Sequence, residues 1–96
     1  VDTGVVCCWT GTGVSIAANK VPGVRAALCG DAETARGARR WNDANVLALG
    51  LATTGPDLAV AIVDAWLDAG EVDDAERVNI DRVSALERRY APPASS

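Results

Sequence analysis

The sequence predicts an α/β protein: a Rossmann-like parallel sheet in three layers, with helices on both faces of the sheet. Two observations support this class. Short aliphatic runs alternate with helical patterns, and glycines follow the runs. The apolar 49% of the 96 residues is mainly Ala, Val and Leu, which suits helices packed closely on a parallel sheet. We expect one domain over residues 1–90 and a flexible tail over residues 91–96.

Three strands and four helices are expected, in the order strand, helix, strand, helix, strand, helix, helix. The first strand has almost no polar alternation, which is typical of a strand covered on both faces. Asp31 is a good N-cap, Pro56 suits the first turn of a helix, and Gly70 suits a helix end. The expected strands cover residues 3–8, 24–29 and 46–49, and the helices cover about 15–20, about 32–41, the segment between 56 and 70, and the segment after the acidic link 71–76.

Right-handed connections make the three strands parallel and neighbouring, and they leave a sheet edge open for pairing. Ligands of such sheets bind beyond the carboxyl ends of the strands, so we expect one crevice bordered by residues 8–13, 29–30 and 50–53. Cys7 and Cys29 are expected in the core. Apolar stripes are expected on three helices, at Ala35, Ala38 and Trp41, at Leu58, Ile62, Ala65 and Trp66, and at Val78, Val83, Leu86 and Tyr90.

Charge and composition exclude several classes of protein. A net charge of −4 and an isoelectric point near 4.6 disfavour a nucleic-acid partner. No apolar run is long enough to cross a bilayer, so no membrane partner is expected. With no histidine and only three cysteines, neither a disulfide framework nor a metal site is expected, and no cofactor is expected. The expected compartment is a reducing cytoplasm.

The length of the chain favours an assembly. A chain of 96 residues buries only a modest core, and this one starts without Met, directly before its first strand. We therefore expect a homo-oligomer, or the interior of a longer protein.

Cys8 lies where the first strand meets the turn Thr10-Gly11-Thr12-Gly13. Backbone N–H groups of such a turn, and of the helix start after it, favour a thiolate that can act as a nucleophile or a base. Successive N–H groups also form a nest for an anion. The alternatives are a small core cysteine and a purely structural turn, because the glycines complete neither a dinucleotide fingerprint nor a Walker loop.

A second polar group follows the second expected helix, in the segment Trp41-Asn42-Asp43-Ala44-Asn45. On spacing alone, these polar residues cap the helix and turn the chain, with Trp41 in the core. The other interpretation is a binding role for Trp41 and Asn42.

Together these motifs resemble the ribose-5-phosphate isomerase type B family, whose relatives include the subunits of galactose-6-phosphate isomerase. The resemblance rests on Cys-x-Thr-Gly-x-Gly-x-Ser-Ile-Ala-Ala-Asn-Lys at residues 8–20, Gly-Val-Arg-Ala-Ala-Leu-Cys at 23–29 and Asn-Asp-Ala-Asn-Val-Leu-Ala-Leu-Gly at 42–50. It covers the later two-thirds of a family member. It implies that three of five parallel strands are present here, and that the protein forms dimers or tetramers with shared active sites, in some cases with an unlike subunit.

The resemblance also implies a function: an aldose–ketose isomerase that acts on a sugar phosphate or a sugar through a cis-enediolate. Cys8 matches the base that transfers the proton, and Thr10 is expected beside it as a catalytic residue. The loop supplies backbone donors to the enediolate oxygen, and the residue matched by Asn42 contacts the sugar from the neighbouring subunit. The implied substrate-binding residues are Trp9, Gly11, Thr12, Gly13, Ser15, Trp41 and Asn42.

Several positions depart from the family pattern. Trp9 stands where Gly is usual, and Trp41 stands where a ring-opening His is usual. Three arginines that clamp phosphate are replaced by Ala52, Ala75 and Asn79. Because arginine binds phosphate through a planar fork, we expect a changed substrate: another sugar phosphate held differently, or a sugar without phosphate.

Two alternatives to an active isomerase stay open. The lost His and arginines favour a non-catalytic subunit of the same fold, whereas the retained Cys8, Thr10 and Asn42 favour an enzyme. A thiol redox protein has no Cys-x-x-Cys motif to support it. The family's first two strand–helix units carry an Asp-His pair that has no counterpart here, so residues 1–96 alone are expected to be inactive.

Overall fold

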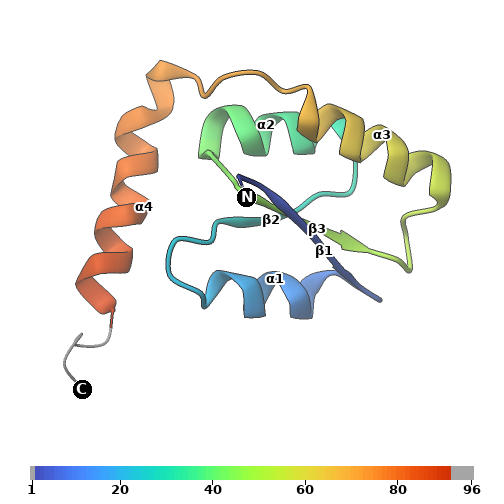
Figure 1. The fold of residues 1–96 in the computed structure, drawn as a ribbon, viewed down its shortest axis with the longest axis horizontal. Helices are drawn as coiled ribbons and strands as arrows, with labels where there is room; N and C mark the ends of the chain where they lie inside the picture. Colours follow the sequence, from blue (N-terminus) through green and yellow to red (C-terminus); the bar gives the residue numbers. More distant parts are fainter. Residues whose placement is uncertain (1, 92–96) are drawn as a thin grey trace.

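The computed structural model describes residues 2–91 and contains the three expected strands, the four expected helices and one short additional 3₁₀ helix (Figure 1). Residues 92–96 of the expected tail lie outside the described residues, and the domain boundary at residue 90 stays a prediction. The elements are β1 (Gly4–Cys8), α1 (Thr12–Asn19), β2 (Ala26–Leu28), α2 (Ala32–Asn42), β3 (Val46–Gly50), α3 (Pro56–Leu67), η1 (Asp74–Glu76) and α4 (Arg77–Tyr90).

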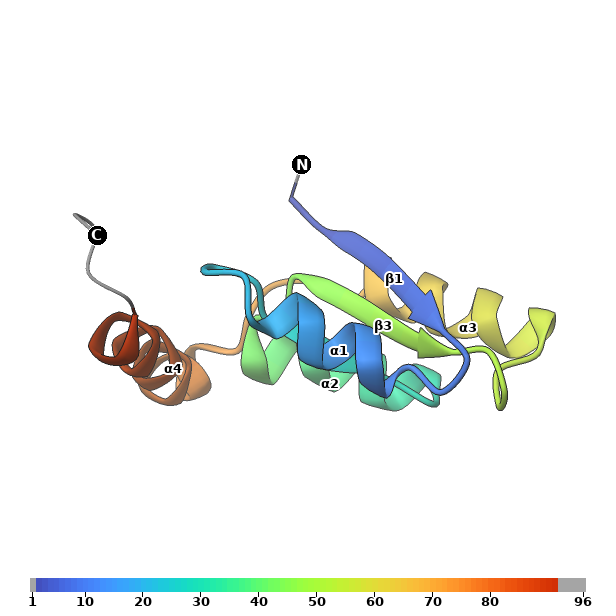
Figure 2. The ribbon, with the colours of Figure 1, turned by 90° about the horizontal axis from the view of Figure 1, so that it is seen from below.

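The strands form one parallel sheet in the order β1-β3-β2. The expected parallel direction is confirmed, but β1 and β2 are not neighbours, because β3 lies between them. Cys8 pairs with Gly50, so the carboxyl ends of β1 and β3 are level. Helix α1 lies on one face of the sheet, and α2 and α3 lie on the other (Figure 1, Figure 2). This arrangement confirms the three-layer α/β class.

The core lies between the sheet and the layer formed by α2 and α3. Leu47 and Leu49 of β3 belong to it, and its largest side chain is Trp66, which is 1% exposed. The indole Nε1 of Trp66 donates to Thr3 Oγ1 at 2.8 Å, so the polar atom of this buried ring has a partner. The remaining members are small or aliphatic, as the composition predicts: Cys29, Ala35, Ala38, Ala44, Ile62 and Ala65.

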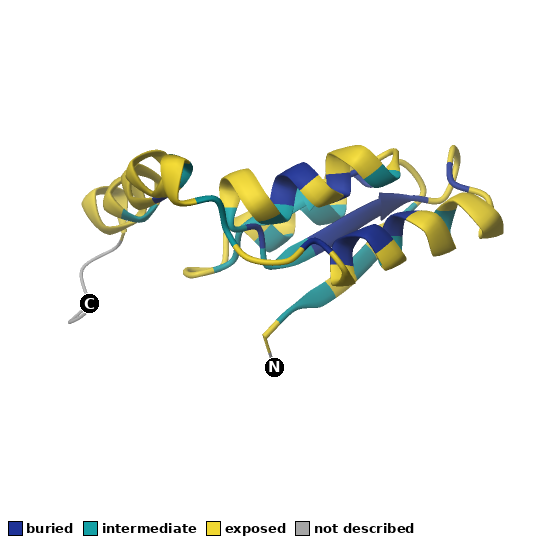
Figure 3. Cartoon of the chain, turned by 90° about the horizontal axis from the view of Figure 1, so that it is seen from above, coloured by how far each residue is buried: buried dark blue, intermediate teal, exposed yellow. Residues whose placement is uncertain are grey.

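Strand β1 differs from its expected environment. Val5 is 51% exposed and Cys7 is also exposed, so the expectation of a strand covered on both faces is wrong for the described residues, as is a core position for Cys7. Their sheet partners, Leu47 and Leu49, are buried. The difference arises because β1 is an edge strand, whereas β3 is the central strand beneath the helical layer (Figure 3).

Helix α4 stands apart from the three layers (Figure 1). Its expected apolar stripe is wrong: Ile80 is its one buried residue, and the four predicted side chains are exposed. One tie to the body is the backbone N–H of Gly23, which donates to Glu87 Oε1 at 2.5 Å. A groove of about 610 Å³ separates α4 from the amino end of β2. The exposed residues are Val78, Val83, Leu86 and Tyr90.

The surface also contains apolar residues on the other helices. Leu58, expected in the inner stripe of α3, is 36% exposed at the start of that helix. Trp41, expected in the stripe of α2, is 51% exposed, so its core assignment is wrong as well. Between residues 2 and 91, no helix has the length and apolar character needed to cross a membrane.

Candidate functional site

The turn after β1 folds back over the thiol of Cys8. Gly11 has a φ of +81°, in the left-handed region that glycine adopts without strain. Its backbone N–H donates to Cys8 Sγ at 3.2 Å, and its carbonyl accepts from Ser15 Oγ at 2.7 Å. One glycine therefore joins the thiol, the turn and the first turn of α1.

The same turn crosses the end of the central strand. The N–H of Leu51 donates to Cys8 O at 2.9 Å, and the N–H of Ala52 donates to Trp9 O at 2.7 Å. A Cβ atom on Gly50 would overlap the carbonyl of Thr10, so only glycine fits beneath the turn. The structure thus brings residues 8–13 and 50–53 together at the carboxyl end of the sheet, and the expected crevice between them stays a prediction. Cys29 also lies at the carboxyl end of the sheet, directly after β2, but its side chain is in the core.

The surroundings of Cys8 favour its charged form. The backbone N–H of Val14, at the start of α1, contributes most to holding the pKa of the Cys8 thiol below its ordinary value. The N–H groups of Gly11, Thr10 and Gly13 act in the same direction, against partial burial. Cys29 is the opposite case, since burial, helped by the charge of Asp31, raises the pKa of its thiol to about 11.

The polar side chains of the turn face solvent beside this thiol. The hydroxyls of Thr10 and Thr12 are hydrogen-bonded to each other at 2.8 Å, and both residues are exposed. Trp9 is 70% exposed. The thiol of Cys8 is itself only partly covered.

Trp41 and Asn42 lie at the other end of the sheet. They end α2, the helix that returns from the carboxyl end of β2 to the amino end of β3. Cys8 lies at the carboxyl end of β1, and a five-residue strand is roughly 15 Å long. Within one chain, the structure therefore does not bring Cys8 and Asn42 together.

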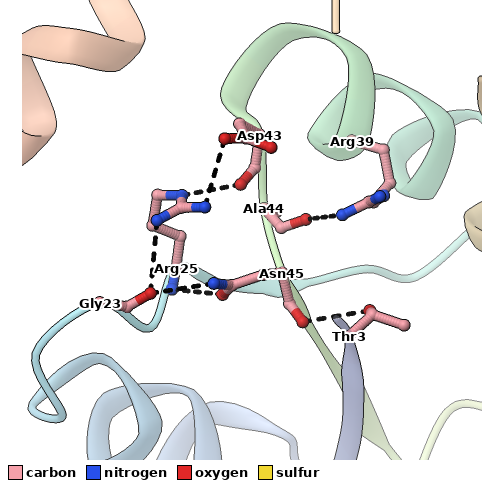
Figure 4. A network of polar contacts seen from close by, with 7 residues as sticks. All are labelled: Thr3, Gly23, Arg25, Arg39, Asp43, Ala44 and Asn45. Carbon is pink, nitrogen blue, oxygen red and sulfur yellow. Dashed lines mark hydrogen bonds and ion pairs between the residues drawn. The ribbon is translucent and has the colours of Figure 1, made fainter. Parts of the chain in front are cut away.

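A polar network that the sequence interpretation missed holds the segment after Asn42 (Figure 4). Arg25 donates from Nε to the carbonyl of Asp43 at 2.7 Å, and its Nη2 lies 3.3 Å from Asp43 Oδ2. Asp43 has a φ of +50°, and its backbone N–H donates to the carbonyl of Ala38 at the end of α2. The expected capping and turning role of this segment is confirmed, but the role of Arg25 was not foreseen.

Asn45 extends the network to all three strands. Its side-chain Oδ1 accepts from the N–H of Arg25 at 2.7 Å, and its Nδ2 donates to Gly23 O at 2.9 Å. Its carbonyl accepts from the N–H of Gly4 at 3.0 Å and from Thr3 Oγ1 at 3.1 Å. β2 begins at Ala26, two residues later than expected, because Arg25 bonds to this side chain and to the adjoining loop.

Metal ligands are sparse in the part of the chain that the structure describes. Over residues 2–91, no three His, Cys, Asp or Glu side chains gather closely enough to hold a metal ion. The carboxyl end of the sheet offers a partly exposed thiol whose pKa is lowered by backbone N–H donors.

Comparison with known proteins identifies the family to which this arrangement belongs. The model of the ribose/galactose isomerase family matches residues 1–85. The chain belongs to this family. The chain is 44% identical over 89 residues to ribose-5-phosphate isomerase B of Escherichia coli, a match that covers 93% of this chain and 60% of that protein.

Two further similar proteins also have names of sugar-phosphate isomerases. D-erythrulose-4-phosphate isomerase of Pectobacterium atrosepticum is 53% identical over 66 residues, which are 69% of this chain and 43% of that protein. The solved structure of ribose-5-phosphate isomerase B of Clostridium thermocellum superposes with a TM-score of 0.89 at 48% identity, over 94% of this chain and 61% of that one. The chain thus spans about 60% of the length of the E. coli relative.

The close packing at Gly11 predicts the effect of adding a methyl group there. Gly11→Ala is expected to lower the free energy of unfolding by more than about 1 kcal/mol, because the left-handed conformation is strained for alanine. The new Cβ would also lie 2.9 Å from the N atom of Gly50. Gly13→Ala, where a Cβ meets nothing within 4 Å, is the control and should stay within about 0.5 kcal/mol. Urea unfolding measures both, and equal losses would contradict this account.

The lowered pKa of Cys8 predicts its reactivity. In a Cys7→Ser protein, alkylation of Cys8 by iodoacetamide should rise with pH around a midpoint below 9.0, because a lowered pKa makes the reactive thiolate available at lower pH. Cys29 should react only near its pKa of about 11. The Cys7→Ser/Cys8→Ser protein should lack the first phase. A Cys8 midpoint at or above 9.0 would show that the turn does not stabilise the thiolate.

Proposed function

We propose that the intact protein carrying this chain is an aldose–ketose isomerase that acts on a sugar phosphate or a sugar through a cis-enediolate. The observation that carries the proposal is the hydrogen bond from the N–H of Gly11 to Cys8 Sγ, in a turn that favours a thiolate. Membership of the ribose/galactose isomerase family supports the reaction class. A reducing cytoplasm is the compartment in which such a thiol stays active.

In this proposal Cys8 is the base. Its thiolate removes the proton from the carbon beside the substrate carbonyl, the C–H electron pair becomes a carbon–carbon double bond, and the carbonyl π pair moves to oxygen. The thiol then returns the proton to the neighbouring carbon, while a hydroxyl proton passes between the two oxygens. A thiolate suits this work because the backbone donors lower the pKa of the Cys8 thiol, so that more of the base is present at a given pH.

The turn after Cys8 stabilises the negative oxygen of the enediolate. The first N–H groups of α1 have no acceptor within the helix, and they begin at Thr12, directly after the turn. Thr10 and Thr12 add two hydroxyls, and Ser15 fixes the carbonyl of Gly11. Donors that are already in place stabilise the charge that develops in the transition state more than the substrate.

The second half of the site comes from another copy or from an unlike subunit. Trp41 and Asn42 lie at the amino end of the sheet, so they cannot meet the Cys8 of their own chain. We propose that they contact the sugar bound beside the Cys8 of a neighbouring subunit, within a dimer or tetramer. Residues 1–96 as an isolated monomer are then inactive, because no single chain has both halves.

A four-carbon ketose phosphate is the substrate that we favour. The relative named as a D-erythrulose-4-phosphate isomerase is 53% identical over 66 residues, against 50% over a stretch of similar length, 68 residues, for the galactose-6-phosphate isomerase subunit LacB of Clostridium acetobutylicum. Two exposed indoles, Trp9 and Trp41, belong to the two halves of the proposed site, and we expect their bulk to favour a shorter sugar.

Removal of the Cys8 thiol tests the chemistry. In the intact protein, Cys8→Ala should slow the exchange of the substrate α-proton with solvent by about 10²- to 10⁴-fold, because it removes the base and leaves the binding groups. Proton NMR in D₂O measures the exchange. Cys7→Ala, on the opposite side of β1, should retain full exchange. A well-folded Cys8→Ala protein with full exchange would rule out Cys8 as the base.

A substrate panel tests the sugar. The intact protein should isomerise D-erythrulose 4-phosphate with a kcat/KM about tenfold or more above that for ribose 5-phosphate, because a pocket sized for the shorter sugar excludes an additional carbon. Unphosphorylated erythrulose should be included. Efficient turnover of ribose 5-phosphate would refute the size argument, and no turnover of any sugar would favour a non-catalytic subunit.

A further inference from the structure

A glycine in the middle of α2 is not required by its backbone. Gly37 is buried, and among the described glycines the positive φ values belong to Gly11, Gly23 and Gly70. Glycine is the poorest helix former after proline, so Ala at position 37 would favour the helix. Another constraint must therefore exclude a side chain at this position.

That constraint is the indole of Trp41, one helical turn further on. A Cβ on Gly37 would lie 2.6 Å from Cζ3 and 2.7 Å from Cε3 of Trp41, closer than real Cβ atoms approach. The six-membered part of the indole therefore lies directly on the helix backbone at Gly37. Any side chain at this position would displace the ring.

The core does not need the ring to lie there. Trp41 is 51% exposed, whereas Ala35 and Ala38 of the same helix are 0% and 7% exposed. A large apolar side chain is thus held in one place while about half of it faces solvent. Large aromatic side chains held rigidly in this way are typical of binding surfaces.

The groove beside the ring indicates what it binds. It measures about 460 Å³, and it is lined by Asn42 next to Trp41 at the end of α2, and by Asp31, Glu33 and Thr34 at the start of that helix. No Lys or Arg lines it. Hydroxyl, amide and carboxylate groups bind sugar hydroxyls, the apolar ring suits sugar C–H groups, and the negative end disfavours phosphate.

We propose that Gly37 is a positioning residue for the isomerase. By lacking a side chain, it holds Trp41 where the exposed part of the indole packs against the hydroxylated carbon chain of the sugar, beside Asn42 and away from the phosphate. This inference rests on the proposed function, because it requires the Trp41 indole to contact the sugar bound in that site.

The test is Gly37→Ala in the intact protein, with D-erythrulose 4-phosphate and ribose 5-phosphate as probes. KM for the better of the two probes should rise about tenfold while kcat stays within about twofold, because a displaced platform weakens substrate binding without removing the base. The thermal midpoint should not fall, since alanine favours the helix. Gly55→Ala, where a Cβ meets nothing within 4 Å, is the matched control and should leave KM unchanged.

A double-mutant cycle separates positioning from a general structural effect. In a Trp41→Ala background, adding Gly37→Ala should leave KM within about twofold, because no ring remains to be displaced. An equal rise in KM in both backgrounds would overturn the proposal. So would a Gly37→Ala protein in which the indole N–H signal of Trp41 has shifted in the NMR spectrum but KM is unchanged.

Ligand titration distinguishes failure of this proposal from failure of the proposed function. If the protein isomerises a probe and saturation leaves the Trp41 indole signal unmoved, Gly37 and Trp41 have no role in sugar binding and the isomerase stands. If the signal moves in the parent protein but not in Gly37→Ala, while no isomerisation occurs, the positioning role stands and the catalytic proposal fails. If no probe turns over or moves the signal, both fail.

Discussion

The sheet depends on one asparagine placed just before its central strand. Asn45 accepts and donates hydrogen bonds that join the start of β1, the segment before β2 and the start of β3 (Figure 4). These bonds fix the register of three short strands at their amino ends. Arg25 then clamps Asp43 in a left-handed conformation that bulky residues avoid. This contact sets the direction in which the chain continues after Asn42, the last residue of α2.

The carboxyl end of the sheet is held by close backbone packing more than by hydrogen bonds between side chains. Gly50 lies beneath the carbonyl of Thr10, and Gly11 lies between the thiol and the first turn of α1. Backbone approaches of this kind leave N–H groups directed at a single point, where Cys8 Sγ lies. Main-chain N–H groups in a turn that depends on glycines thus lower the pKa of the Cys8 thiol.

Local signals in the sequence were sufficient for the strands, for the helix cap at Asp31 and for the turn after Cys8, because each depends on residues that are adjacent in the chain. The position of β3 between β1 and β2 was not predictable, since chain order does not determine which strand is central. Burial of Val5 and Cys7 was wrongly predicted, because an apolar run on an edge strand resembles one on a central strand. Periodicity likewise could not show that α4 stands apart from the core.

The separation between the two ends of the sheet has a consequence for how such proteins diversify. Cys8 and its turn are built from β1, α1 and Gly50, whereas Trp41 is held by its own helix. A substitution near Trp41 is therefore expected to leave the packing around the Cys8 thiol unchanged. The residues at one end of such a sheet can therefore change in the course of evolution while the structure at the other end stays the same.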